Sequence, residues 1–181
     1  MTDAVRVHHV VVYGPPASGK LSVAQAVARR TGARVLHSHL TTDLVTEIVD
    51  REAPGFWELV KALRLHLSTV VASLRIDLVS TTAFIPADQT WISEFGEALA
   101  AVGAQVHFVQ LRPSLVALEQ RVRAESRRQH GKLTSVESLR SALAEADYFA
   151  RIGDEDLSID NTALSPDEVA AQIVSHCKLV P

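Results

Sequence analysis

The sequence is short of three things: cysteine, long apolar runs and an excess of charge of one sign. Cys177 is the only cysteine among the 181 residues, so no disulfide can form within the chain, which favours a reducing compartment. No stretch approaches the roughly 18 apolar residues that a membrane-spanning helix needs, and the apolar run at 7–13 is too short for a signal peptide. We therefore expect a cytoplasmic protein with no membrane partner.

Charge and composition narrow the class of protein further. Lysine and arginine number 18 against 21 for aspartate and glutamate, and the formal net charge of −3 argues against a general nucleic-acid partner. Hydrophobic residues make up 47% of the chain, which is ordinary for a single globular domain that needs no disulfide or structural metal. Within this acidic chain, four arginines nevertheless fall close together, at Arg121, Arg123, Arg127 and Arg128.

Short β-branched runs alternate with longer helical patterns along the chain. We predict strands over 7–13, 34–37, 76–82, 105–111 and 157–160. Helices are expected over 20–30, 41–50, 56–74, 89–101, from 114 into the arginines, over 134–149 and from 165 onward. This alternation predicts an α/β fold in which helices cover both faces of a parallel sheet, with a ligand at the carboxyl ends of the strands.

Several of these helices carry start signals or an apolar stripe. The candidate N-terminal caps are Thr41 or Thr42, Asp88, the capping-box pair Thr134–Glu137 and the capping-box pair Ser165–Glu168. In the helix over 56–74, large apolar residues recur at helical spacing, at Leu59, Leu63, Leu67, Val70 and Leu74.

The first predicted strand and helix are joined by the run Gly14-Pro15-Pro16-Ala17-Ser18-Gly19-Lys20, which matches the pattern G-x-x-x-x-G-K. Glycines allow successive backbone N–H groups to point into one concavity, and the helix that begins near Lys20 adds its positive amino-terminal end. The lysine ammonium would neutralise the outer phosphates of a nucleotide. The alternative is a Gly-Pro turn without a ligand. We interpret the run as a phosphate-binding loop.

The position after the lysine departs from the usual loop, because Leu21 stands where a Ser or Thr normally holds Mg²⁺, and Ser22 follows it. This spacing resembles the nucleoside monophosphate kinases, whose loop reads G-K-x-T. The resemblance implies that ATP is the cofactor, that Ser22 contacts its α- or β-phosphate, and that Mg²⁺ is held mostly through water and ATP oxygens. The expected phosphate-binding residues are Gly14, Ala17, Ser18, Gly19, Lys20, Leu21 and Ser22.

The arginine cluster follows the fourth predicted strand by one helix. One interpretation is a solvated helix face, with Glu119 and Glu125 as partners of Arg123 and Arg121. The other is a lid that brings cations to the transferring phosphate, hinged at Gly131. Because the same chain carries a phosphate-binding loop, we favour the lid.

With these features in place, the whole chain resembles the superfamily of nucleoside monophosphate kinases and shikimate kinases, and by pattern it is most similar to small bacterial P-loop kinases. The matching segments are GPPASGKL, HSHLTTDLV and SRRQHGKL. The resemblance implies a single P-loop kinase domain over 1–181, folded as a three-layer α/β/α sandwich with strand order 2-3-1-4-5. It also implies a substrate-binding helical hairpin at about 40–75 and a lid at about 121–136.

The resemblance further assigns roles around the nucleotide. It implies that Arg121 packs on the adenine and that Arg127 reaches the phosphates, with Arg123 and Arg128 as partners in the lid. The loop after the fifth strand often contacts the adenine edge in this superfamily, which points to Asn161 and Thr162. These two residues also suit an ordinary turn.

In shikimate and gluconate kinases and in chloramphenicol phosphotransferase, an aspartate near the end of the second strand takes the proton of the acceptor hydroxyl. This chain has His37-Ser38-His39 there, and Asp43 follows one helical turn later. On a strand His37 and His39 would face the same way, and a neutral histidine can act as a base near pH 7. The alternative is a set of ordinary polar residues at a strand end. We favour the interpretation that His37, His39 and Asp43 bind the acceptor molecule, with His39 or Asp43 as the base.

The third predicted strand ends in Ser80-Thr81-Thr82, without the acid that relatives place there to order the waters of Mg²⁺. Arg64 and Phe84 lie on segments that could line the acceptor cleft, and an arginine there could bind a carboxylate or phosphate on the acceptor.

The function that we predict is ATP-dependent transfer of the γ-phosphate to a hydroxyl of a small molecule, with Lys20 and Arg127 stabilising the transferring charge. A first alternative is a nucleotide-binding module without efficient transfer, which the unusual residue after Lys20 and the missing acid both favour. A second is a polynucleotide kinase, which the net charge of −3 disfavours. The sequence identifies neither the acceptor nor the oligomeric state.

Overall fold

A five-stranded sheet forms the middle layer of the computed structural model, which describes residues 6–124 and 133–179. The strands are β1 (Val7–Tyr13), β2 (Arg34–Leu36), β3 (Leu78–Thr82), β4 (Ala104–Leu111) and β5 (Leu157–Ile159). They lie in the order β2-β3-β1-β4-β5, and every neighbouring pair is parallel. The predicted parallel sheet and the order 2-3-1-4-5 are therefore confirmed.

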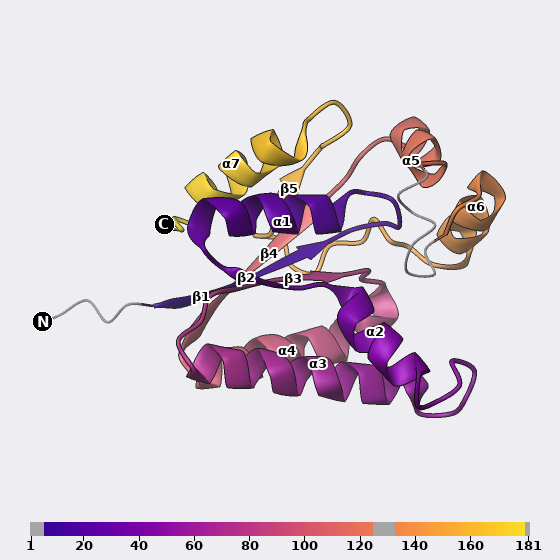
Figure 1. Cartoon of the computed structure of the whole chain (residues 1–181). Coiled ribbons are helices and arrows are strands. Elements are labelled where there is room, and N and C mark those ends of the chain that lie inside the picture. The colour runs from indigo at the N-terminus through magenta and orange to yellow at the C-terminus, as the bar shows by residue number, and fades with distance from the viewer. Residues whose placement is uncertain (1–5, 125–132, 180–181) are drawn as a thin grey trace, which may run out of the picture.

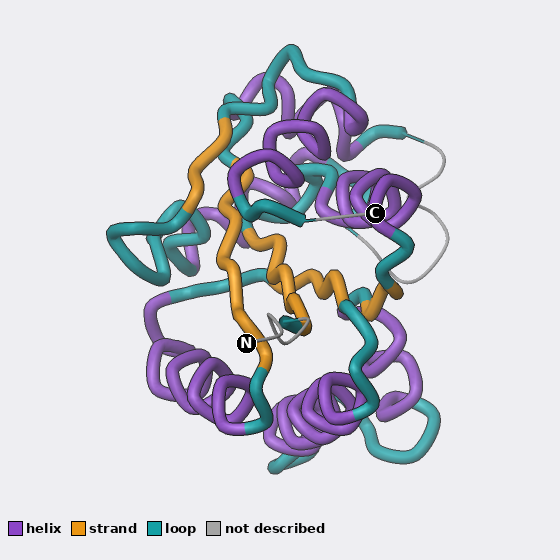
Figure 2. Tube along the Cα trace, turned by 90° about the vertical axis from the view of Figure 1, so that its left-hand side faces the viewer, coloured by secondary structure: helices purple, strands orange, loops and turns teal. Residues whose placement is uncertain are grey.

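Helices cover both faces of this sheet, as Figures 1 and 2 show. On one face lie α1 (Lys20–Thr31) and α7 (Pro166–His176), and on the other lie α3 (Phe56–Ser73) and α4 (Gln89–Ala101) (Figure 1). Shorter helices stand at the carboxyl ends of the strands: α2 (Ser38–Thr46), α5 (Leu115–Val122) and α6 (Val136–Glu145), with the 3₁₀ turn η1 (Pro86–Asp88) before α4. The fold is thus the predicted three-layer α/β/α sandwich. Within the described residues, no helix is both long and apolar enough to cross a bilayer.

Successive side chains of the central strand β1 point to opposite faces of the sheet, so the strand contributes to both apolar cores. Val10 and Val12 pack with α1 and α7, whereas Val11 and Tyr13 pack on the other face with α4. Because both faces of the strand are buried, five of its seven residues are apolar, as expected for the middle of a parallel sheet, and the other two are His8 and His9.

Two of the predicted helix starts differ from the structure. The helix expected from Thr41 begins at Ser38 and ends at Thr46, and Thr41 donates a hydrogen bond to the carbonyl of Ser38 instead of capping. The helix expected over 89–101 is confirmed with Asp88 as its N-cap residue, but the carboxylate of Asp88 makes no capping bond and pairs with Lys61 at 2.7 Å. In α6 the cap is Ser135, which accepts from the N–H of Ser138, so the capping box predicted one residue earlier is wrong. The capping box Ser165–Glu168 is confirmed.

The leucine stripe of α3 predicts that the leucines face the sheet, but in the structure another side of the helix is buried. Its buried side chains are Phe56, Val60, Arg64, Ser68 and Ala72. Bulky rings already fill the core beneath its carboxyl half, among them Phe84 and Phe95, so the small Ser68 and Ala72 suit the side that faces the sheet. Leu59, Val70 and Leu74 remain 44%, 43% and 64% exposed.

Candidate active site

The predicted phosphate-binding loop joins β1 to α1 at the carboxyl edge of the sheet. Gly14, with φ at 139°, lies so close to β4 that an added Cβ would collide with the carbonyl oxygen of Leu111. Ala17 and Gly19 also have positive φ angles, of 66° and 93°. An alanine in this region is uncommon, and here it is held by apolar contacts with α5 and α6. The loop is therefore sharply curved and braced from two sides.

The start of α1 leaves room for a negatively charged ligand. Its N-cap is Gly19, which supplies no side-chain oxygen, and its first turn carries no acidic residue. The first backbone N–H groups of a helix have no partner within the helix, and the helix dipole makes this end positive. Both features suit a phosphate group at residues 19–22. Ser22 lies exposed on this first turn, and Leu21 beside it is half-buried.

Lys20 folds back over the loop that precedes it. Its Nζ donates hydrogen bonds to the carbonyl oxygens of Gly14 and Pro15, at 2.9 and 2.8 Å, and lies 3.5 Å from the hydroxyl of Ser18. The ammonium is thus already positioned beside the concavity of the loop. Phosphate oxygens could replace these neutral acceptors with little movement of the side chain.

A hydrogen-bond network behind the loop joins three distant segments. The carbonyl of Ser18 accepts from Nδ2 of Asn161 at 2.8 Å and from Nη1 of Arg121 at 3.4 Å. Nη2 of Arg121 donates in turn to the carbonyls of Asn161 and Thr162, at 2.7 and 3.1 Å. Thr162 also accepts, through its hydroxyl, from the N–H of Ser114, the cap of α5. Partial burial lowers the pKa of Arg121, against an opposing effect of Asp160.

The structure therefore brings together Arg121, Asn161, Thr162 and the loop, four features that the sequence predicted separately. Arg123 lies exposed where α5 ends. Arg127 and Arg128, and half of the predicted lid over 121–136, lie outside the described residues. The alternative pairing of Glu119 with Arg123 is not seen, since Glu119 binds Nε of Arg140 at 2.7 Å.

The predicted acceptor residues gather where β2 gives way to α2. The strand ends at Leu36, His37 occupies the N-cap position of the helix without a side-chain capping bond, and His39 lies in the first turn. The prediction that both histidines share one face of a strand is therefore wrong. They still lie close, with ring centroids 6.3 Å apart, and Nδ1 of His39 is 3.5 Å from Oδ1 of Asp43. The N–H of Ser38 donates to the hydroxyl of Thr81, which fixes this corner to the end of β3.

Arg64 reaches the same corner from α3. It is 8% exposed, and its guanidinium donates to Thr41 Oγ1 at 3.1 Å and to Thr82 Oγ1 at 3.4 Å. A third bond, at 3.4 Å, runs to the carbonyl of Ser38. Burial lowers its pKa to about 10, opposed by Asp88. Each of these acceptors is neutral, so within the described residues the buried cation is hydrogen-bonded to no carboxylate. Phe84, by contrast, lies in the core against Tyr13 rather than at a cleft.

One contact at this edge was not predicted from the sequence. The hydroxyl of Tyr13 donates to Oδ2 of Asp156 at 2.6 Å and accepts from the N–H of Ile152. Burial and the nearby Asp156 both raise the pKa of Tyr13. Gln110 adds bonds from Nε2 to the carbonyls of Phe149 and Ala150. The segment that returns from α6 is thereby fixed beneath the phosphate loop. The feature of the sequence that could have indicated this contact is the tyrosine directly before Gly14.

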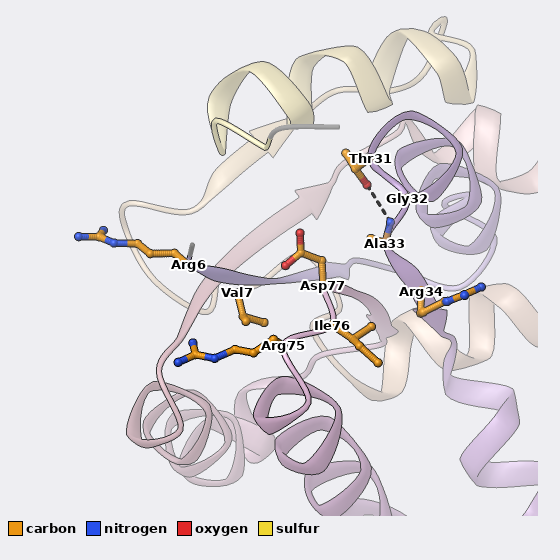
Figure 3. A pocket seen from close by; sticks show the side chains of 9 residues that line it. All are labelled: Arg6, Val7, Thr31, Gly32, Ala33, Arg34, Arg75, Ile76 and Asp77. Carbon is orange, nitrogen blue, oxygen red and sulfur yellow. Dashed lines mark hydrogen bonds between the residues drawn. The ribbon is translucent and has the colours of Figure 1, made fainter. Parts of the chain in front are cut away.

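A pocket of about 580 Å³ lies at the opposite, amino-terminal edge of the sheet (Figure 3). It is lined by Arg6, Val7, Thr31, Gly32, Ala33, Arg34, Arg75, Ile76 and Asp77. None of the predicted site residues lines it, so it is separate from the phosphate loop.

No protein-family model matches the chain, and no curated protein matches it in sequence. Solved structures do match. A sugar kinase from Janibacter sp. HTCC2649 is 18% identical with a TM-score of 0.67, covering 97% of this chain and 96% of that one. A shikimate kinase from Acinetobacter baumannii in complex with shikimate is 17% identical with a TM-score of 0.64, covering 95% and 93%. The Mycobacterium tuberculosis APS kinase, in complex with AMPPNP and APS, is 17% identical with a TM-score of 0.67, covering 96% and 98%.

The chain is thus similar over nearly its full length to P-loop kinases of small molecules. Because the sequence identities are low, this structural similarity shows the fold alone, and the fold is that of the shikimate kinase-like P-loop kinases. This agrees with the resemblance that the motifs in the sequence indicated.

Proposed function

We propose that this protein is an ATP-dependent phosphotransferase that moves the γ-phosphate to a hydroxyl of a small molecule. The observation that carries the proposal is the curved loop from Gly14 to Lys20, which ends in an uncapped helix start and carries a lysine beside its concavity. The kinase fold of the structural neighbours supports it.

ATP would bind with its phosphates along residues 14–22. The N–H groups at the start of α1 would donate to phosphate oxygens, and Lys20 would exchange its carbonyl partners for the outer phosphates. Arg121, Asn161 and Thr162 would border the adenine, because Arg121 and Asn161 already donate to the loop at Ser18 and Thr162 accepts from Arg121. Arg123, Arg127 and Arg128 would supply the lid, and Arg127 would stabilise charge on the transferring group.

The acceptor would approach from the corner formed by α2, α3 and the end of β3. If Nδ1 of His39 donates to Asp43, its Nε2 can accept the proton of the acceptor hydroxyl. The acceptor oxygen then bonds to the γ-phosphorus as the bond to the bridging oxygen of ADP breaks. Asp43 would orient the ring, and His37 would contact the acceptor.

Arg64 would bind an acidic group on the acceptor. A carboxylate or phosphate would give this buried guanidinium the charged partner that its neutral contacts do not supply. We therefore expect acceptors that carry both a hydroxyl and an anionic group.

Mg²⁺ would reach the site with ATP. Among residues 6–124 and 133–179, no group of three or more His, Cys, Asp or Glu side chains could hold a metal, which fits an ion coordinated by ATP and water near Ser22. When bound, Mg²⁺ would offset the negative charge of the phosphates.

The proposal is tested with purified protein in two steps. Isothermal titration calorimetry with ATP should give binding to wild type and a loss of at least about tenfold in affinity for Lys20→Ala. The exposed Lys178, far from the loop in sequence, provides the matched control Lys178→Ala, which should bind as wild type does. Phosphorus NMR with a panel of hydroxy acids, sugars, nucleosides and antibiotics then detects transfer. Equal ATP affinity in wild type and Lys20→Ala would refute the proposal.

One observation favours a second function, a nucleotide-binding module without efficient transfer. The end of β3 carries Ser80, Thr81 and Thr82, and no carboxylate follows to order the waters of Mg²⁺. ATP binding that depends on Lys20, with no transfer to any acceptor of the panel, would support this function over the first.

A further inference from the structure

The carbonyl of Ser18, next to last in the phosphate loop before Lys20, is held by two donors from other parts of the chain. Nδ2 of Asn161 lies 2.8 Å from this oxygen and Nη1 of Arg121 lies 3.4 Å from it. The first donor stands in the loop after β5 and the second on α5. Ser18 is fully buried and Asn161 is 3% exposed, so water competes little for the bond between them.

The side-chain amide of Asn161 serves this carbonyl and not the surface. Its donor is directed at Ser18, and its Oδ1 is buried and has no hydrogen-bond partner among the described residues. A buried acceptor without a partner is unfavourable, and such a group in a folded protein calls for an explanation. With both polar atoms turned inward, only the main chain of Asn161 is left to border an adenine.

We infer that Asn161 and Arg121 are positioning residues for the phosphates: by holding the carbonyl of Ser18, they turn the N–H of Gly19 into the concavity of the loop. The peptide between Ser18 and Gly19 is trans, and in a trans peptide the carbonyl and the following N–H point in opposite directions. Gly19 is the N-cap of α1, so its N–H has no acceptor within the helix. This role rests on the proposed function, because it takes a polyphosphate as the ligand of the loop.

Gly19 does not fix the direction of this peptide by itself. Its φ is 93°, and a glycine changes its backbone angles at little cost. A half-turn of the peptide would direct the carbonyl of Ser18 at the phosphates, whose oxygens repel it. The same rotation would break both bonds to the carbonyl and leave the buried amide of Asn161 without its acceptor. The two donors therefore oppose the rotation that would spoil the site.

Arg121 also holds the residue that supplies the other donor. Its Nη2 donates to the carbonyls of Asn161 and Thr162, at 2.7 and 3.1 Å. The hydroxyl of Thr162 accepts from the N–H of Ser114, which caps the helix that carries Arg121. These contacts form a closed set that exists without a ligand. The N–H of Gly19 is thus oriented before a phosphate arrives, which reduces the cost of binding.

The affinity for inorganic triphosphate separates this role from a contact with the base. Asn161→Leu keeps the approximate size of the side chain and removes its donor. Its affinity for triphosphate and for ATP should fall about tenfold or more, because the N–H of Gly19 is no longer held toward the phosphates, whereas adenosine should bind within about twofold of wild type. Isothermal titration calorimetry with each of the three ligands provides the comparison.

Thr31→Val is the matched control, because it removes a polar group of similar surroundings at the other end of α1. The hydroxyl of Thr31 donates to the carbonyl of Val27 and accepts from the N–H of Ala33. This variant should bind all three ligands as wild type does. Circular dichroism checks that every variant is folded, and Asn161→Ala repeats the test with a smaller side chain if Asn161→Leu does not fold.

A double-variant cycle with triphosphate tests whether the two donors act on the same peptide. Asn161→Leu and Arg121→Met should each weaken binding, and the loss in the double variant should be smaller than the product of the two single losses. A product of the two losses would refute the joint role.

The outcomes distinguish this role from the proposed function itself. Wild-type affinity for triphosphate in a folded Asn161 variant, with affinity lost in Lys20→Ala, would overturn the positioning role alone. A wild type that binds neither ATP nor triphosphate would overturn the proposed function together with it.

Discussion

Gly14 is the tightest position of the phosphate loop, and it illustrates how a single residue determines the shape of the site. Its φ of 139° is open to glycine and strained for other residues, and the carbonyl of Leu111 occupies the space that a Cβ would need. Gly32, which ends α1 with φ at 77°, differs in one respect: nothing lies within 4 Å of its added Cβ. A comparison of substitutions at Gly14 and Gly32 therefore distinguishes the effect of a steric collision from the effect of backbone strain alone.

Gly14→Ala should lower the affinity for ATP by at least about tenfold, because the loop must move away from β4. Gly32→Ala should cost only about 1–2 kcal/mol of stability, the strain of a left-handed alanine, and leave ATP binding unchanged. Calorimetric titration and urea unfolding of both variants provide the comparison. Equal loss of ATP affinity in the two variants would contradict this account.

At the scale of elements, the return segment after α6 is attached to the sheet by two side chains. Tyr13 binds Asp156 and the N–H of Ile152, and Gln110 binds two successive carbonyls, those of Phe149 and Ala150. These bonds connect parts of the chain that are far apart in sequence. They fix the segment in the absence of a strand or helix there.

Tyr13→Phe should lower the free energy of unfolding by about 1–3 kcal/mol, since the partly buried N–H of Ile152 loses its acceptor and Asp156 keeps only the N–H of Gly153 as a donor to Oδ2. Amide hydrogen exchange should accelerate over 149–156 in particular. Tyr148→Phe removes a hydroxyl from the neighbouring turn and is the control. Unchanged exchange over 149–156 in Tyr13→Phe would show that the tyrosine does not fix the segment.

Some local signals in the sequence were reliable. The tight turn between β1 and α1 and the capping box of Ser165 each lie within a few residues, and both are present as predicted, whereas the equally local cap at Thr134 was not. The sequence of α3 could not predict which of its sides is buried. That side is determined by aromatic rings of other elements, which leave room only for small side chains such as Ser68 and Ala72. The same holds for Arg64 and its threonine partners, since Thr41 and Thr82 reach it only in the folded chain.

For the molecule as a whole, two histidines contribute to the response to acid, the buried His9 and the half-buried His107. His9 is 1% exposed in the central strand, where Nε2 lies 2.8 Å from the hydroxyl of Ser80, and burial lowers its pKa to about 3. Burial, with the nearby His8 and His176, lowers the pKa of His107 to about 4. In the unfolded chain histidine titrates near pH 6.5, so the unfolded state binds more protons below that pH.

Stability should therefore fall as the pH drops from about 6.5 toward about 4, by about 1.4 kcal/mol per pH unit for the buried His9 and by less for the half-buried His107, which solvent partly screens. His9→Gln keeps a polar side chain beside Ser80 but does not titrate, so its unfolding free energy should depend less steeply on pH. Urea unfolding at a series of pH values measures both slopes. Identical slopes in wild type and His9→Gln would mean that His9 is not responsible.

The internal bonds of Lys20 have a consequence for selectivity among anions. An incoming ligand must displace Gly14 and Pro15 from the ammonium, so the binding free energy is the difference between two sets of partners. A weakly basic, singly charged anion gains little from that exchange, whereas a polyphosphate supplies several strong acceptors at once. In the function that we propose, the loop would thus compete with its own ligand, and this competition would favour polyphosphates over small, singly charged anions.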